Sequence, residues 1–189
     1  MATMQMERSN LWEVSSRVIV YAAIGAALYA VTAPLSFLIP GTESVSIRPA
    51  FAIVTFFGFA FGPIVGLFTG LVGNMIGDQL SGWGLLTSWN WSVAIGLVGL
   101  LAGLTPLYLR GWMNDRGRML AAAAIGSAIA TIIGLLFVFT DIILGTTEDF
   151  NSALTVNYVP AVISDVVTAV ILTPILVAAW QPVKEQLGR

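Results

Sequence analysis

Residues 47–77 read IRPAFAIVTFFGFAFGPIVGLFTGLVGNMIG, an almost unbroken apolar run. A helix that crosses a bilayer needs about 20 apolar residues, so this run is too long for a single straight crossing. The dipeptide Gly62-Pro63 lies in its middle and is typical of a turn. The run therefore predicts two helices, at residues 49–61 and 64–80, with one long kinked helix as the alternative.

The composition of the chain is that of a membrane protein. Of its 189 residues, 57% are hydrophobic and 10% are charged, and the mean hydropathy is +0.89. Soluble domains carry about 25% charged residues, so a soluble enzyme is excluded. The net charge of −2 offers no basic surface to a nucleic acid. The chain has no Cys and no His, so we expect no catalytic residue and no metal site, although a site of carboxylates alone stays allowed for a hard metal ion.

The hydropathy pattern predicts a single membrane domain, residues 1–189, with six spanning helices. A polar segment, residues 1–17, precedes them, and a tail, residues 181–189, follows them. The six helices are predicted at residues 18–39, 49–61, 64–80, 89–109, 119–140 and 158–180. The fold class is thus an all-α integral membrane protein.

The basic residues decide the orientation. With six spans, seven of them lie on the side of the termini, and Arg48 alone lies on the other side. Basic loops stay in the cytoplasm, so both termini are predicted to be cytoplasmic. The seven are Arg8, Arg17, Arg110, Arg116, Arg118, Lys184 and Arg189.

Small residues form a stripe on the first predicted helix. Ala22, Ala26 and Ala30 recur every four residues on one face, and Ala23 and Ala27 lie beside them. Such a smooth face lets another helix approach closely in lipid. The stripe predicts either docking of a partner protein or packing within this chain's own bundle.

Polar and aromatic residues gather in the outer half of the predicted bundle. Polar groups in hydrocarbon are costly and are candidates for function. Asn74 and Asp78 are four residues apart and so share a helix face, and Asp165 lies about two turns into the last span. The candidate binding residues are Tyr29, Arg48, Asn74, Asp78, Trp83, Trp89, Asn90, Trp91, Asp141, Asn157, Tyr158 and Asp165.

Several of these candidates have structural alternatives. Trp89 and Trp91 could belong to an interfacial belt, Asp141 could end a helix in water, and Asn74 could hold a helix crossing together. Asp78 could pair with Arg48. An ionised Asp165 at its depth needs a partner, a ligand or a proton.

The outer charges indicate the kind of ligand. Arg48 is opposed there by six acidic residues, which favours a neutral or cationic molecule over a polyanion. Trp and Tyr side chains stack on flat rings or enclose a cation. The six are Glu43, Asp78, Asp141, Glu148, Asp149 and Asp165.

Two features point to a known family. One is the stretch from Ala50 to Asn74, in which an FGP-x-x-G turn leads into a helix of small residues, and the other is the alanine stripe. With its length and six predicted spans, the chain resembles the S component, the substrate-binding subunit, of energy-coupling factor (ECF) vitamin transporters of the riboflavin-type branch.

The resemblance implies a non-enzymatic subunit in a prokaryotic plasma membrane. Such a subunit captures a micronutrient outside the cell and docks through the alanine stripe onto a T component. Two cytoplasmic ATPases drive that T component, so this chain itself needs no cofactor. The loops at residues 41–48 and 81–88 become gates.

The ligand and one alternative function stay open at the level of sequence. Riboflavin, pyridoxine-like vitamers, thiamine precursors and methionine-related compounds are all compatible with the outer half. The alternative is a self-sufficient small secondary transporter or channel that uses Asp165.

Overall fold

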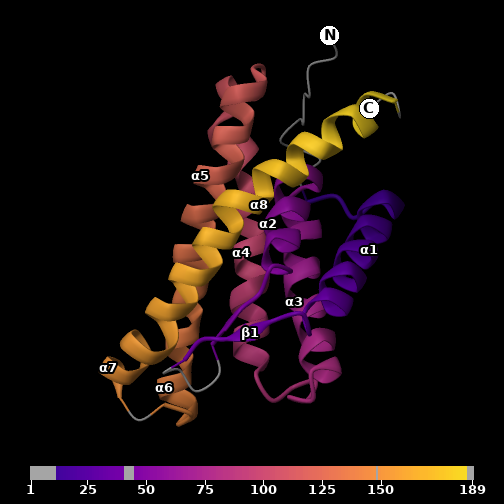
Figure 1. The fold of residues 1–189 in the computed structure, drawn as a ribbon. Helices are drawn as coiled ribbons and strands as arrows, with labels where there is room; N and C mark the ends of the chain where they lie inside the picture. Colours follow the sequence, from indigo (N-terminus) through magenta and orange to yellow (C-terminus); the bar gives the residue numbers. More distant parts are fainter. Residues whose placement is uncertain (1–11, 41–44, 148, 187–189) are drawn as a thin grey trace.

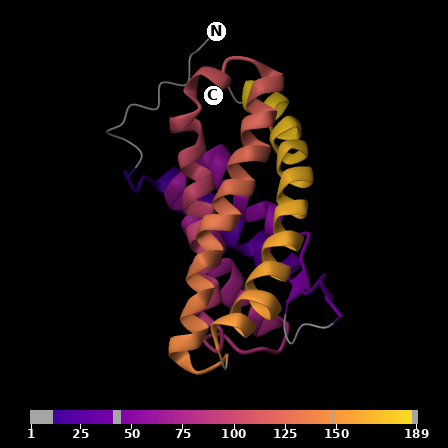
Figure 2. The ribbon, with the colours of Figure 1, turned by 90° about the vertical axis from the view of Figure 1, so that its left-hand side faces the viewer.

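A computed structural model describes residues 12–40, 45–147 and 149–186 of the chain. Within these ranges the fold is helical, as expected, and six helices have eleven or more residues (Figures 1 and 2). They are α1 (Ser16–Thr32), α2 (Phe51–Phe61), α3 (Pro63–Leu80), α4 (Trp89–Tyr108), α5 (Arg116–Gly134) and α8 (Val159–Gln186).

Three helical segments of the described chain are long and apolar enough to cross a membrane. These segments are Trp89–Tyr108, Arg116–Leu144 and Phe150–Gln186, and Ser16–Thr32 and Phe51–Phe61 are shorter apolar helices. In Figure 1, α1 begins and α8 ends toward the same end of the bundle. This arrangement is compatible with an even number of crossings, and the count of six stays a prediction.

The apolar run of residues 47–77 folds as two helices that meet at Gly62. Its φ of +105° lies in the region that glycine favours, and Pro63 opens α3, where no N–H is needed. The Gly62 N–H closes α2 by donating to the Gly58 carbonyl, and the Gly62 carbonyl accepts the Gly66 N–H at the start of α3. The chain reverses at this point, so α2 packs beside α3 and α4.

The first helix is shorter than predicted. It ends at Thr32 instead of residue 39, because Pro34 has no N–H to donate to the next helical hydrogen bond. The chain then forms strand β1 (Phe37–Leu38), which pairs antiparallel with β2 (Ser46–Ile47). This small hairpin was not expected in an all-α protein. Residues 41–44, part of the first predicted gate, lie outside the described residues.

The segment between α5 and α8 is mostly helical, although a long polar loop was predicted there. The backbone tightens into the 3₁₀ turn η3 (Leu135–Phe139) and continues through α6 (Thr140–Leu144). After α7 (Phe150–Ser152), the π-helical turn η4 (Ala153–Tyr158) leads directly into α8. At the opposite end, the short turn η2 (Arg110–Trp112) connects α4 to α5. Residues 1–11 and 187–189 of the predicted termini lie outside the described chain.

The alanine stripe faces inward, which corrects its prediction as a docking surface. Ala22, Ala26 and Ala30 are at most 5% exposed. A Cβ built on Gly73 of α3 would lie 3.1 Å from the Ala26 carbonyl oxygen, so the two backbones are in close contact. Small residues on both helices allow this approach, and the stripe is therefore used within the chain. Ala23 and Ala27, on the neighbouring face of α1, are exposed.

Aromatic residues fill the bundle where α2 and α8 end. The ring of Phe61 stacks on Tyr21 at 4.3 Å and meets Trp180 edge-on at 5.1 Å. Deeper in the bundle, the hydroxyls of Thr55 and Thr173 lie 2.6 Å apart and are fully buried. This half of the molecule is thus tightly packed.

Candidate ligand-binding site

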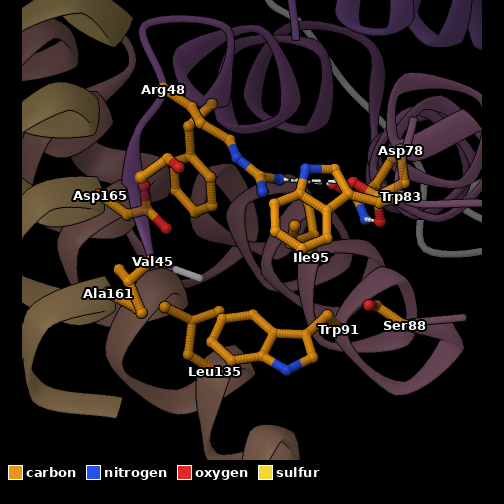
Figure 3. Close-up of a pocket in the computed structure, with 13 residues that line it drawn as sticks. Val45, Arg48, Asp78, Trp83, Ser88, Trp91, Ile95, Leu135, Ala161 and Asp165 are labelled. Atoms are coloured by element: carbon orange, nitrogen blue, oxygen red, sulfur yellow. Dashed lines mark hydrogen bonds and ion pairs between the residues drawn. The ribbon is translucent and has the colours of Figure 1, made fainter. Parts of the chain in front are cut away.

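A cavity of about 620 Å³, part of it open to solvent, lies at the other end of the bundle (Figure 3). Its walls come from β2 and the residues after it, from α3, from the α3–α4 connection, and from α4, η3 and α8. Six of the predicted candidates line it, namely Arg48, Asn74, Asp78, Trp83, Trp91 and Asp165. The mixed polar and aromatic lining is typical of a small-molecule site.

Asn74 is the centre of one polar network on this cavity. Its side-chain oxygen accepts hydrogen bonds from the Tyr29 hydroxyl and from Arg48 Nη1, both at 3.1 Å. Its amide nitrogen donates to Asp78 at 2.9 Å and to the Ser92 hydroxyl at 3.0 Å. The predicted shared face of Asn74 and Asp78 is therefore confirmed. Tyr29 itself is fully buried and joins the network through this amide.

Arg48 is held on one side of the cavity by this network. Its Nη1 lies 3.8 Å from an Asp78 carboxyl oxygen, so the pairing considered from the sequence is present. Burial alone lowers the pKa of Arg48, but Tyr29 and Asp78 outweigh it and raise the pKa above its usual value. Arg48 is therefore a cation, and its guanidinium already contacts Asn74 and Asp78 within the fold.

Asp165 lies across the cavity from Asp78, with the Arg48 guanidinium between them in the view of Figure 3. Its side chain is buried, at 8% exposed. Its Oδ1 atom has no hydrogen-bond partner within the described part of the chain. A buried polar atom without a partner costs about 1–3 kcal/mol, which a ligand that donates a hydrogen bond can recover.

Asp141 is the centre of a second network, beside the cavity. Only 4% of the residue is exposed, so the alternative of a helix end in water is wrong. Oδ1 accepts from Asn90 at 2.7 Å and from Thr146 at 3.1 Å. Oδ2 accepts from Trp91 Nε1 at 3.0 Å and from Asn157 at 3.4 Å. Asn90, Asp141 and Asn157 are thus brought together, but they do not line the cavity.

Trp89 and Tyr158 lie away from the cavity. Trp89 is two residues before Trp91, and two residues correspond to about 200° around a helix. The two rings therefore point to opposite sides, and Trp89 is 42% exposed. The Tyr158 hydroxyl donates to the Ile132 carbonyl at 2.8 Å. These two residues therefore do not line the cavity.

Some lining residues were missed by the sequence analysis. Phe51 and Ile95 are apolar and were not among the candidates, and Ser46 lies in the unpredicted strand β2. Helical spacing offered a signal for two of them, because Ile95 follows Trp91 by four residues and Ala161 precedes Asp165 by four. No group of three or more carboxylates able to hold a metal ion occurs among residues 12–40, 45–147 and 149–186.

Comparison with known proteins identifies the family. The family model for the ECF-type riboflavin transporter, S component, matches residues 13–181. A UPF0397 protein of Vibrio atlanticus (strain LGP32) is 34% identical over 101 residues, which cover 53% of this chain and 54% of that protein. The chain thus spans about half the length of the curated relative it matches, and no solved structure matches it. Because the family model covers nearly the whole chain, the protein belongs to the family of S components of ECF-type riboflavin transporters.

Proposed function

We propose that this chain is the substrate-binding subunit of an ECF-type importer and captures a small water-soluble vitamin in the cavity described above. S components work with a T component and ATPases and take a vitamin-like ligand. The observation that carries the proposal is the buried, unpartnered Asp165 oxygen in a cavity with indole walls. Such a lining is suited to binding a small molecule.

The cavity lining favours a flat heteroaromatic ring or an amine. Trp83 and Trp91 offer aromatic faces, and Asp165 offers an acceptor for an N–H or O–H group of the ligand. Riboflavin is the first ligand to test, because the family description names it. Pyridoxine-like vitamers, thiamine precursors and methionine-related compounds remain the alternatives.

The orientation follows from the charges at the two ends of the bundle. Arg110, Arg116 and Arg118 lie at or near the α4–α5 connection, and Lys184 lies near the end of α8. Figure 1 shows the start of α5 and the end of α8 at the end of the bundle opposite the α3–α4 connection, which contributes to the cavity wall. Basic residues favour the cytoplasmic side, so the cavity faces outward and the termini lie in the cytoplasm of a prokaryotic cell.

The tight packing of the cytoplasmic half of the bundle supports the view that partner proteins must drive the release of the ligand into the cell. Along α8, Thr173 lies between Asp165 of the cavity and Ala178, which lines a second cavity at the cytoplasmic end. The Thr55–Thr173 contact and the aromatic cluster around Phe61 occupy the space between the two ends. Inward release therefore requires a large rearrangement, which the T component and two ATPases supply.

The docking surface for the T component is proposed on the outward face of α1. Ala23 and Ala27 are exposed there and present little side chain. Ala27→Trp is expected to abolish uptake in cells that carry the partner proteins while ligand binding persists. Ala179→Trp, the same change at an exposed alanine of α8, is the matched control and should retain uptake.

The test of the function combines binding and transport. Mass spectrometry of small molecules that co-purify with the chain, followed by calorimetric titration with riboflavin, is expected to show binding by this chain alone. Liposomes that contain only this chain should show no uptake, and added T component and ATPases should restore it with ATP. Proton-driven uptake by the chain alone would support the alternative, a secondary transporter that uses Asp165.

A further inference from the structure

Trp91 connects the cavity to the Asp141 network. Its ring lines the cavity, and Figure 3 shows the indole nitrogen on the edge turned away from Arg48 and Asp78. That nitrogen donates to Asp141 Oδ2 at 3.0 Å. One edge of the indole is therefore fixed from outside the cavity, and its other side is available to a ligand.

Both carboxyl oxygens of Asp141 accept hydrogen bonds from the protein. It accepts from four side chains, which come from α4, from the α6–α7 connection and from η4. An amide in the same place offers one acceptor oxygen and turns N–H groups toward donors. The arrangement of donors therefore requires a carboxylate and fixes the carboxylate plane.

A rotation of Trp91 about its side-chain bonds would break the bond to Asp141. Stacking on a flat ligand depends on the angle at which the indole presents its face. The contact is buried on the Asp141 side, which is 4% exposed, so water cannot readily replace the lost acceptor. The orientation of the indole is thus coupled to a residue that does not line the cavity.

We propose that Asp141 is a positioning residue for ligand binding, which sets the orientation of Trp91 as a wall of the cavity without touching the ligand. This inference rests on the proposed function, because it assigns the cavity to a ligand. The Asn157 amide of η4 donates to the same carboxylate, which ties this turn to α4.

The experiment uses the full chain labelled with 5-fluorotryptophan in lipid nanodiscs. The chain has six Trp residues, so fluorine NMR gives few signals, and Trp91→Phe assigns the one of interest. Asp141→Asn is expected to shift the Trp91 signal and to leave the signal of Trp180 unchanged. Riboflavin titration of the same variant should show about threefold weaker binding.

Asp149→Asn is the matched control. Asp149 carries the same side chain in the same connecting segment, but it is exposed, and its carboxyl caps the start of α7 by accepting from the Ser152 backbone N–H at 2.7 Å. This variant should leave both the Trp91 signal and the affinity unchanged. Asp141→Glu, which keeps the charge and both acceptor oxygens, should restore part of the lost affinity.

Two results would overturn the proposal. One is a Trp91 signal at its wild-type position in Asp141→Asn, and the other is a shifted signal with unchanged affinity. If Asp141→Asn does not fold, Trp91→Phe replaces it, because Phe keeps an aromatic face but has no N–H. About threefold weaker binding then supports the proposal, and wild-type binding contradicts it. If the wild-type chain binds no riboflavin, the chosen ligand of the proposed function fails, and the fluorine signal alone decides whether Asp141 orients the indole.

Discussion

Two carboxyl groups at the same end of the bundle, Asp141 and Asp165, are almost equally buried, at 4% and 8% exposed. Asp141 accepts hydrogen bonds from four side chains, whereas Oδ1 of Asp165 has no partner within the described residues. Burial alone therefore does not distinguish a structural carboxylate from a binding one. The difference lies in whether the fold itself supplies the donors, and a cavity wall that lacks them is prepared for a ligand.

The comparison is tested most severely by the stability of Asp141→Asn. The amide turns N–H groups toward donors that now lack an acceptor, and each buried donor without a partner costs about 1–3 kcal/mol. We predict that the free energy of unfolding falls by about 2 kcal/mol or more, measured by denaturant titration in mild detergent. Asp165→Asn should cause no such loss, since few internal bonds depend on it. Equal losses in the two variants would remove the distinction between the two groups.

Affinity should show the reverse order. Asp165→Asn replaces one carboxyl oxygen on the cavity with an NH₂ group and so removes an acceptor, and we predict at least tenfold weaker riboflavin binding, about 1.4 kcal/mol. Calorimetric titration of the purified chain measures this directly. The thermal stability of the variant should equal or exceed that of the wild type, because an unpartnered buried carboxyl is replaced by an amide. Unchanged affinity would show that Asp165 does not contact the ligand.

Trp91 belongs to both halves of the comparison, because its ring lines the cavity and its N–H reaches Asp141. Trp91→Ala removes the stacking face, worth about 1 kcal/mol, and we predict about fivefold weaker riboflavin binding. Quenching of the remaining tryptophan fluorescence on titration provides the measurement. A loss greater than that of Asp165→Asn would mean that stacking, and not the carboxyl, dominates recognition.

Local sequence patterns predicted the parts of the fold that depend on near neighbours. The Gly62-Pro63 break follows from the backbone chemistry of those two residues, and the Asn74–Asp78 contact follows from their spacing. The apolar composition of the long hydrophobic segments was sufficient to predict the all-α fold class. Such features need no knowledge of what lies across the bundle.

Features that depend on distant partners could not be predicted in the same way. The alanine stripe at Ala22 and Ala26 marks a smooth face, but only the glycines of α3 reveal that this face is occupied within the chain. Asp141 is 50 residues from its partner Trp91, so no local pattern indicated that its carboxyl is buried and hydrogen-bonded. The hairpin of β1 and β2 likewise pairs two short segments that are separated by a connection. Each strand is too short to show an alternating sequence pattern.

Trp89 provides the smallest expected effect and the sharpest control for the indole wall. It is on the same helix as Trp91, but about 200° away around the axis, and it is 42% exposed outside the cavity. Trp89→Ala removes the same side chain from the same turn of α4, so any general effect of losing an indole there appears in both variants. We predict less than a twofold change in riboflavin affinity for Trp89→Ala, measured by the same titration as Trp91→Ala. A loss as large as that of Trp91→Ala would place the ligand at the outer rim of the bundle instead of between Trp91 and Asp165.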